Sequence, residues 1–461
     1  MALNTVAAPA VFAVTLYLVI FRPRRLNPGL GAMAGAGLAL LTGLITPENV
    51  LAVGRITWNA TLSLVGIILV SLVLDEVGFF RWAALHMARA ARGDGRRVFF
   101  LTLLLGTAVS ILFTNDAAVL ILTPIVYEML EALAFDPRAS LPFIMGAGFI
   151  ADALSLPFST SNLTNIMTAD FFKVPFAFYA ARMVWPTLAS LVASLAVLFL
   201  YFRRDLPRRY DAKALPSPES AIRDRPLFLL GMLVFAVMLA SFFGGPLSRW
   251  PVSFIILAAA AVLLEEGARR RKVNAAVVVR TAPWPVIVFS IGMYLVVYGL
   301  QNAGYVAVLT RAHLTLAARG TVVAAVGAGV IGAVLSSVTN NLPALMLGAL
   351  ALRGAGIATL GGAAAVSGTT AGSGLSTAAG SGAVVGALPA HTQSALVFGN
   401  LLGCDIGPKM TPLGSLATLL WMGILERKGV KIGWGYYLKV GLVITPPVLL
   451  AALTALGLAL R

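Results

Sequence analysis

The strings FTNDAAVLILTP (residues 113–124) and VTNNLPALMLGAL (residues 338–350) decide the fold of this chain. Each places a Thr-Asn pair inside an apolar stretch where a membrane-spanning helix is expected, so hydroxyls and amides stand where lipid would reject them. Polar breaks within hydrocarbon persist only where protein buries them or where they line a cavity. Two breaks in corresponding halves therefore indicate a transporter whose site lies near the bilayer midplane.

The composition around these breaks is that of a polytopic membrane protein. The chain is 59% hydrophobic and 11% charged, with a mean hydropathy of +0.91, whereas soluble domains carry roughly 25% charged residues. Its apolar runs are continuous and do not alternate with the period of two of a membrane barrel. We predict an all-α fold with about 10 spanning helices. The first apolar run, residues 6–21, lacks a cleavage site and is expected to remain.

The net charge of +16 follows the loops. Lys and Arg gather in residues 22–25, 81–97, 203–225, 269–280 and 427–439. This is the positive-inside pattern, which places these loops in the cytoplasm. It explains the net positive charge better than nucleic-acid binding does. A single cysteine excludes an intrachain disulfide and a thiol-clustered zinc site. Because no nucleophile–base pair, metal cluster or phosphate loop stands out, we expect neither an enzyme nor a cofactor.

We predict two transmembrane halves, residues 1–205 and 226–461, joined by a cytoplasmic linker at 206–225 that is rich in charge and proline. Within the second half, residues 361–390 are almost entirely Gly, Ala, Ser and Thr and are interpreted as an insertion.

The halves read as repeats. Thr114-Asn115 matches Thr339-Asn340 at an offset of 225, and Ser161-Asn162 matches Thr411-Pro412 at an offset of 250. In this alignment Asn341 takes the place of Asp116, so only one half carries the acid.

Loop charge constrains the topology. The loops 80–97 and 203–225 are both basic, yet three apolar segments, 98–133, 143–168 and 176–202, lie between them. Three full crossings would put the loops on opposite sides. Either one segment is re-entrant or the long 98–133 stretch counts as two, and we predict that 143–168 is the re-entrant hairpin.

Asp116 is the first candidate for chemistry. A carboxylate at bilayer depth costs about 2.5–3.5 kcal/mol, and burial favours its neutral form. A group that gains and loses a proton inside a site suits proton coupling. The alternative is a structural acid at the N-terminus of a half-helix.

Amides and hydroxyls surround this acid. Asn115 and Asn340 offer donors and acceptors, and Thr114 and Thr339 add hydroxyls, which suits a neutral solute that bears hydroxyl groups. The alternative is that these amides only tie down unwound backbone.

A second polar stretch includes Asp152, and its counterpart includes Cys404, Asp405, Lys409 and Ser415. Asp405 and Lys409 are four residues apart, and we predict a structural ion pair between them. The sharper alternative pairs Lys409 with Asp116. Cys404 is expected to be a small buried side chain rather than a thiolate ligand.

Three blocks carry a resemblance to a known family: FTNDAA with LILTPI (113–125), GFIADA with SLP and SNL (148–163), and GCDIGPK with TPLGSLATLLW (403–421). They resemble the arsenite and antimonite efflux carriers of bacterial arsenic-resistance operons, within the ion transporter superfamily. The likeness covers nearly the whole chain and departs most at 361–390 and 203–225.

The resemblance implies two inverted repeats in the bacterial cytoplasmic membrane, each with a re-entrant hairpin and a broken helix. It implies export of As(III) or Sb(III) as the neutral hydroxide, driven by inward proton movement, and the option of a partnership with the family's cytosolic arsenite-stimulated ATPase. The family's polar site then falls on Asn115, Asp116, Ser161, Asn162, Asn340, Asn341, Thr411 and Ser415.

Three alternatives stay open. A sodium-coupled carboxylate carrier of the same superfamily would need sodium ligands at both hairpins. A sodium–proton antiporter would use Asp116 with Asp152. A facilitative channel for neutral metalloids would show no proton dependence and would not concentrate its substrate.

Overall fold

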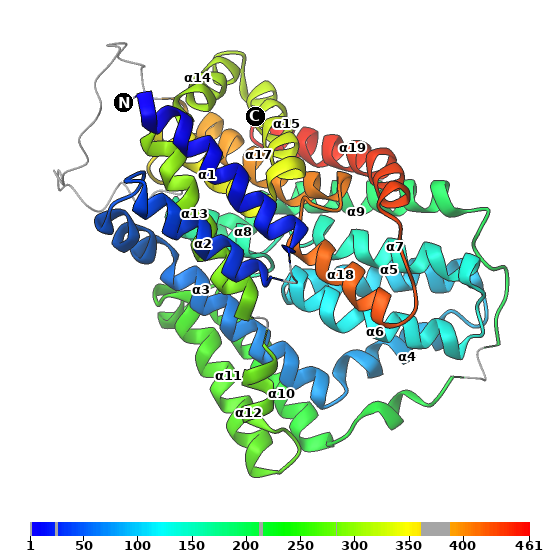
Figure 1. Ribbon diagram of the computed structural model, residues 1–461. Helices are drawn as coiled ribbons and strands as arrows, with labels where there is room; N and C mark the ends of the chain where they lie inside the picture. Colours follow the sequence, from blue (N-terminus) through cyan, green and yellow to red (C-terminus); the bar gives the residue numbers. More distant parts are fainter. Residues whose placement is uncertain (1, 24–25, 212–214, 283, 361–387) are drawn as a thin grey trace.

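The computed structural model describes residues 2–23, 26–211, 215–282, 284–360 and 388–461. Over these residues the chain is helical, and the sole β feature is an isolated bridge between Asp94 and Arg209. The predicted all-α class is confirmed (Figure 1). Most of the predicted insertion at 361–390 lies outside the described residues.

The first half contains α1 (Ala2–Phe21), α2 (Pro28–Leu41), α3 (Pro47–Glu76), α4 (Phe79–Ala90), α5 (Gly95–Leu112), α6 (Asn115–Ala132), α7 (Pro137–Ala153), α8 (Leu163–Phe171) and α9 (Phe176–Phe202). The second contains η3 (Pro218–Ala221), α10 (Arg225–Ser241), η4 (Pro246–Arg249), α11 (Val252–Arg269), α12 (Ala275–Thr281), α13 (Trp284–Asn302), α14 (Val306–Ala317), α15 (Thr321–Thr339), α16 (Asn341–Gly354), α17 (Ala390–Ile406), η6 (Gly407–Met410), α18 (Leu416–Arg427) and α19 (Trp434–Ala459). In the described residues, six segments are long and apolar enough to cross a membrane, and four shorter helices are also apolar.

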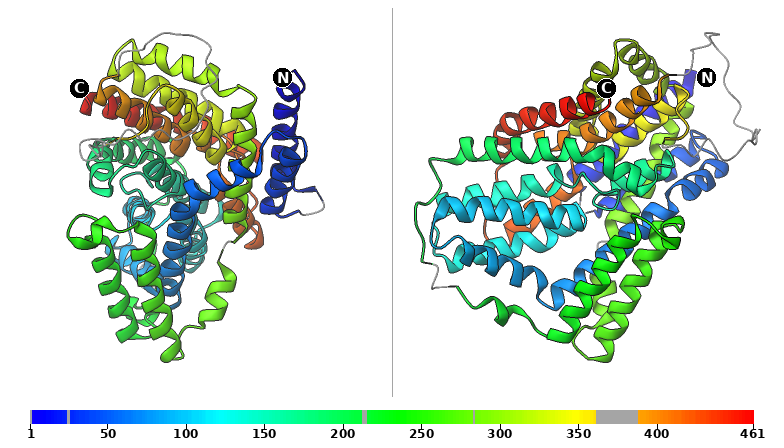
Figure 2. Two further views of the ribbon diagram at one scale, coloured as in Figure 1. Left: turned by 90° about the vertical axis from the view of Figure 1, so that its left-hand side faces the viewer. Right: turned by 180° about the vertical axis from the view of Figure 1, so that it is seen from behind.

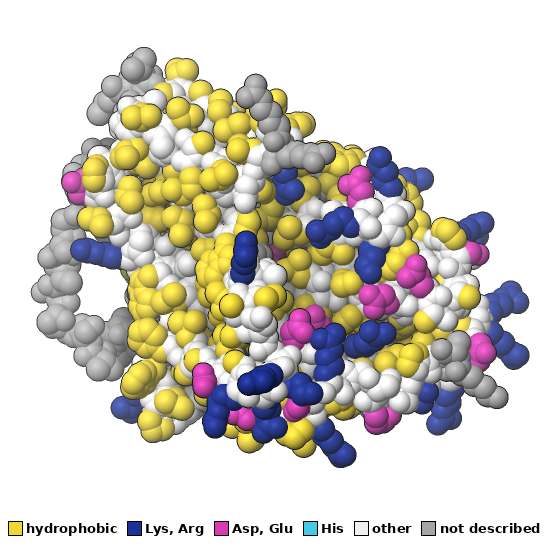
Figure 3. Space-filling model, turned by 60° about the horizontal axis from the view of Figure 1, so that its bottom comes forward, with side chains coloured by type: hydrophobic (Ala, Val, Ile, Leu, Met, Phe, Trp, Pro, Cys, Tyr) yellow, Lys and Arg dark blue, Asp and Glu magenta, His cyan; other side chains and the backbone are white. Residues whose placement is uncertain are grey.

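The basic loops share one side of the molecule. Arg223 forms an ion pair with Glu76 at 2.8 Å, and Arg270 lies 3.9 Å from Asp224. The N–H of Gly95 donates to the carbonyl oxygen of Arg208. Figure 3 shows Lys and Arg side chains over much of this face, with apolar surface beside them. The positive-inside rule assigns this side to the cytoplasm.

Helices α5 and α6 form the re-entrant hairpin of the first half. The backbone of Tyr210 donates to Gly93, just before α5, and its ring contacts that of Phe135, just after α6. The hairpin therefore enters and leaves on the cytoplasmic side, with its tip at residues 113–114. The views in Figure 2 show α5, α6 and α7 lying together.

Helices α7 and α8 instead form one crossing that is interrupted at residues 154–162. The start of α7 lies on the cytoplasmic side, because Arg138 pairs with Asp205 at 2.8 Å. The end of α8 leads into the start of α9. The C-terminus of α9 lies just before Asp205, so the start of α9 lies on the other side of the membrane. The prediction that 143–168 is re-entrant is wrong. The segment 98–133 is the one that doubles back. Hydropathy does not distinguish the two cases, because a polar break permits a reversal of the chain as readily as a kink.

The second half repeats this plan. Helix α14 contacts both the beginning of α15, where Leu316 lies against Gly327, and the end of α16, where Thr310 donates to Ala351 at 3.0 Å. Both ends of the α15–α16 pair therefore lie together, and α17 and α18 flank a second interruption.

Helices α15 and α17 run parallel, and their backbones are in direct contact. Gly399, Gly403 and Gly407 lie against Ala325, Gly329 and Ala333, each set spaced by four residues. A Cβ at position 403 would come 2.0 Å from the carbonyl oxygen of Gly329. Small residues at this spacing let membrane helices approach closely, so this contact fixes the second hairpin against the second broken helix.

Candidate functional site

Four helices begin at one small cavity. They are α6 from the first hairpin, α8 from the first broken helix, α16 from the second hairpin and α18 from the second broken helix. The cavity has a volume of about 20 Å³ and is lined by Asn115, Asp116, Asn162, Leu163, Val286, Asn341, Leu342, Ser415, Leu416 and Ala417. Each helix start contributes a partial positive charge to the cavity.

Each hairpin tip is tied to the broken helix of its own half by one backbone hydrogen bond. The N–H of Asn115 donates to the carbonyl oxygen of Ser161 at 3.1 Å, and the N–H of Asn341 donates to that of Gly414 at 2.8 Å. These bonds are equivalent, and they place the two interruptions in the same relation to the two tips.

The equivalence corrects the predicted alignment. Asn115 corresponds to Asn341 rather than to Asn340, so Asp116 corresponds to Leu342 and Asn341 does not take its place. Ser161 corresponds to Gly414 rather than to Thr411. Matching identical residue types fails at the hairpin tips because they differ in length: two residues separate α5 from α6, and one separates α15 from α16.

The structure brings five of the eight predicted site residues to the cavity: Asn115, Asp116, Asn162, Asn341 and Ser415. The other three use their side chains to hold backbone. Ser161 donates to Phe158 at 2.7 Å, Thr411 donates to Ser337 at 2.6 Å, and Asn340 donates to Leu413 at 3.3 Å.

The two threonines before the tips also serve the backbone. The hydroxyl of Thr114 accepts from the N–H of Ala117 at 3.1 Å and caps α6. The hydroxyl of Thr339 donates to the carbonyl oxygen of Leu335. Both hydroxyls therefore bond to helix backbone in this conformation.

Two buried polar atoms at the cavity have no hydrogen-bond partner within the described protein: Asn115 Oδ1 and Ser415 Oγ. The amide of Asn115 is oriented by its other end, because Nδ2 donates to Asp152 at 2.8 Å. A buried polar atom without a partner costs about 1–3 kcal/mol. These atoms are therefore equipped to bind a polar solute.

Lys409 pairs with Asp152, not with Asp405 or Asp116. Its ammonium lies 2.6 Å from Asp152 Oδ2, and both side chains are 2% exposed. Both predicted pairings are wrong, because the break at Gly407-Pro408 carries Lys409 off the helix face of Asp405 and toward α7. Asp405 instead accepts hydrogen bonds from Thr164 and Asn162 of the first broken helix.

Cys404 is fully buried, with its sulfur 3.8 Å from the carbonyl oxygen of Gly332, as expected for a packing residue. The described residues hold no cluster of three or more His, Cys, Asp or Glu side chains suited to a metal ion.

Sequence reasoning missed three residues. Thr164 donates to the carboxylate of Asp405, Thr418 accepts from the ammonium of Lys409, and Val286 lines the cavity. They come from apolar or unremarkable sequence and carry no signal. The spacing of Gly399, Gly403 and Gly407 is different, since a glycine every fourth residue in an apolar segment does predict close helix packing.

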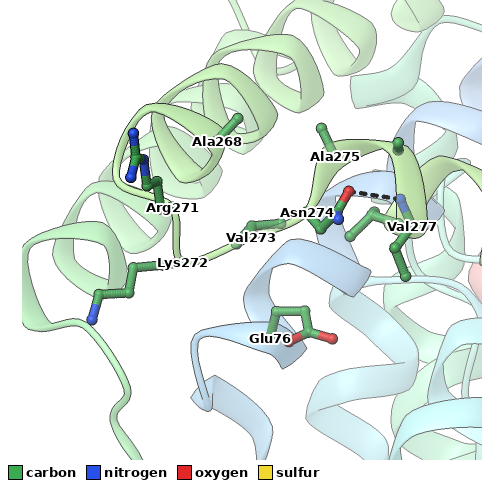
Figure 4. A pocket seen from close by; sticks show the side chains of 10 residues that line it. Glu76, Ala268, Arg271, Lys272, Val273, Asn274, Ala275 and Val277 are labelled. Carbon is green, nitrogen blue, oxygen red and sulfur yellow. Dashed lines mark hydrogen bonds between the residues drawn. The ribbon is translucent and has the colours of Figure 1, made fainter.

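A larger groove lies away from this cavity, between the end of α3 and the α11–α12 turn (Figure 4). It has a volume of about 620 Å³. Two of its polar side chains are already engaged, because Glu76 pairs with Arg223 and the side chain of Asn274 caps Val277. It shares no lining residue with the cavity at the two breaks, and it is not the candidate site.

Two hairpin tips and two interrupted helices that enclose a polar cavity, within a bundle of apolar helices, define a multi-pass membrane transporter with a central site. The chain belongs to the arsenical pump membrane protein family, which it matches over residues 7–392 and 378–460. The predicted family resemblance is thereby confirmed.

The chain is 45% identical over 453 residues to the arsenical pump membrane protein of Escherichia coli strain K12, covering 98% of each chain. It is 26% identical to the putative arsenical pump membrane protein of Bacillus subtilis, covering 96% of this chain and 97% of that one. The crystal structure of the Alcanivorax borkumensis YdaH transporter, with an unusual topology, matches with a TM-score of 0.56 at 17% identity, over 90% of this chain and 89% of that chain. Bacterial pump relatives and the apolar helices place this protein in the bacterial inner membrane.

Proposed function

We propose that this protein exports As(III) and Sb(III) across the inner membrane as neutral hydroxides, in exchange for protons. The relatives named as arsenical pumps support the arsenical cargo. The observation that carries the chemistry is the cavity itself, where one carboxylic acid, Asp116, stands among amides, a hydroxyl and four helix starts.

A trihydroxide both donates and accepts hydrogen bonds, and the cavity offers both. Asn115 Oδ1 and the carboxylate of Asp116 accept from the O–H groups, while Ser415 Oγ and the first N–H groups of α18, which have no side-chain cap, donate to the oxygens. The lining includes neither Arg nor Lys among the described residues, so no cationic side chain is available there to neutralise an anionic solute.

Asp116 couples the proton to the cargo by competition. Ionised at the first turn of α6, it is favoured by the helix dipole and accepts a hydrogen bond from the hydroxide. Protonated, it presents an O–H and loses acceptor capacity, so the cargo is released. A proton taken from outside then displaces the metalloid outward, and loss of that proton to the cytoplasm restores binding.

Access requires the hairpin tips to move. A volume of about 20 Å³ holds about one water molecule, which is less than a trihydroxide needs. We therefore expect the tips to separate from the broken helices when cargo enters, and the bonds from Asn115 to Ser161 and from Asn341 to Gly414 are the ones that must yield.

The test is arsenite uptake into everted vesicles under an imposed pH gradient. Asp116→Asn should abolish pH-driven uptake while the purified protein stays folded. Glu131→Gln is the matched control, because Glu131 lies exposed at the other end of the same helix. Unchanged pH-driven uptake by Asp116→Asn would remove Asp116 from coupling.

The four helix starts also favour an anion, which keeps a carboxylate carrier as the second candidate. The same vesicles separate the cases. A cation-coupled carboxylate carrier would take up a carboxylate rather than arsenite, and sodium–proton exchange would need no metalloid. A facilitative channel would equilibrate arsenite without concentrating it. Added cytosolic ATPase and ATP would reveal a pump partnership through uptake without a pH gradient.

A further inference from the structure

The ammonium group of Lys409 is held like a bound cation. Besides Asp152 Oδ2, it meets the carbonyl oxygen of Gly148 at 2.8 Å and the hydroxyl of Thr418 at 3.1 Å. An ammonium has three N–H donors, and these oxygens surround it together with the hydroxyl of Tyr437, which also interacts with Lys409. The contact with Asp152 is a close ion pair between two buried side chains.

The position of this shell is that of a coupling-ion site. Gly148 and Asp152 lie in the last two turns of α7, just before its interruption. In transporters built from broken helices, the negative C-terminal ends of half-helices and their carbonyl groups coordinate Na⁺ or H⁺. A carboxylate, a carbonyl and a hydroxyl are also the hard oxygen ligands that such cations prefer.

The ammonium enters this shell from the other half of the molecule. Lys409 belongs to η6 in the second interruption, and Thr418 belongs to α18, whereas Gly148 and Asp152 belong to the first half. Asp152 in turn orients Asn115 at the first hairpin tip through its other oxygen. The ammonium of Lys409 thus links the second broken helix to the first and, through Asp152 and Asn115, to the cavity.

The equivalent acid of the second half has no such cation. Asp405 is the second-to-last residue of α17, as Asp152 is of α7, and its partners in the described structure are the neutral groups of Thr164 and Asn162. A resident cation at only one of two equivalent positions indicates a specific role rather than a general need of the fold.

We propose that Lys409 is a tethered cation that occupies an alkali-ion site at the end of α7, which makes this carrier independent of sodium. The inference concerns the cation and does not depend on the cargo. If the ammonium is removed, the oxygens of Asp152, Gly148 and Thr418 are left as a site for a free cation of the size of Na⁺.

The experiment compares purified protein in sodium chloride with protein in choline chloride. Unfolding is followed by reaction of a thiol dye with Cys404, the single cysteine of the chain, which is buried in the fold. Wild type should unfold at the same temperature in both salts. Lys409→Met should unfold several degrees lower in choline chloride and regain at least half of that loss in sodium chloride.

Two further variants define the site. Lys409→Met combined with Asp152→Asn removes both charges and should show no sodium response. Lys428→Met is the surface control, because Lys428 forms a part-exposed ion pair with Glu128 and should not respond to sodium. If Lys409→Met folds only in sodium chloride, that outcome supports the proposal. Equal loss in both salts, failure to fold in both, or sodium dependence of the wild type would each overturn it.

Discussion

Replacement of Gly403 by alanine tests whether the backbone contact between α15 and α17 holds the second hairpin in place. The added Cβ would lie 2.0 Å from the carbonyl oxygen of Gly329 and 2.9 Å from the backbone nitrogen of Ala333. These are backbone atoms of the middle of α15, so no side chain can turn away to make room. The helices themselves must separate.

The separation sets the size of the effect. Ordinary Cβ contacts begin at 3.4 Å, so a distance of 2.0 Å demands an opening of about 1.4 Å. Overpacking of a well-packed core costs about 1–3 kcal/mol, and we expect the upper end, about 3 kcal/mol, because the opposing atoms are backbone. The opening also weakens the hydrogen bond from Ser336 to the carbonyl oxygen of Gly403, which is already 3.3 Å long.

Thermal unfolding followed by tryptophan fluorescence measures this cost, and Gly403→Ala should lower the midpoint by roughly 5 °C. Gly423→Ala in α18 is the matched control, because its Cβ meets nothing within 4 Å, and helix propensity makes that change neutral or slightly stabilising. Arsenite uptake should fall with Gly403→Ala, since α15 carries the second hairpin tip. An unfolding midpoint equal to that of the wild type would refute the packing argument.

Two smaller changes test local features. Thr114→Ala removes the N-cap of α6 and should cost about 1 kcal/mol, seen as a lower unfolding midpoint than that of Thr339→Ala, whose hydroxyl caps no helix start. Asp94 caps α5 outside the membrane, and its pKa is lowered by the N–H of Arg97 and further by that of Arg96. Its stabilisation is therefore present above the ordinary value of 3.8 and lost as the pH falls through the lower folded value, so the difference between wild type and Asp94→Ala should be constant near neutral pH and vanish only in acid.

The breaks in the helices are predictable from the sequence because they depend on a local free-energy cost, that of placing a polar group in hydrocarbon. A hydroxyl or amide in hydrocarbon is expensive wherever it stands, so the Thr-Asn pairs predict two breaks in the helices without any knowledge of neighbouring helices. Loop charge likewise required one returning segment. Neither signal says which break reverses the chain, because reversal depends on where the next helix packs, and 98–133 and 143–168 both contain a suitable polar interruption.

The ion-pair and hydrogen-bond partners of the polar residues could not be predicted from the sequence for a related reason. Lys409 lies four residues from Asp405 in sequence but meets Asp152, 257 positions earlier, because a glycine-proline break ends the helix between Asp405 and Lys409. Helical spacing is informative only where the helix continues. The one-residue error that aligned Asn115 with Asn340 has the same origin, since breaks differ in backbone path while helices do not.

The two halves share a backbone plan and differ in charge, and that difference bears on mechanism. Equivalent bonds tie Asn115 to Ser161 and Asn341 to Gly414, so either hairpin can be released by the same small change. Asp116, however, faces the cavity where Leu342 stands in the other half. A carrier with a symmetric frame has two comparable conformations available, and a charge on one side alone makes their relative free energy depend on protonation of that side. In the proposed exchange, the first hairpin senses the proton, and the second supplies an uncharged surface against which the cargo is held.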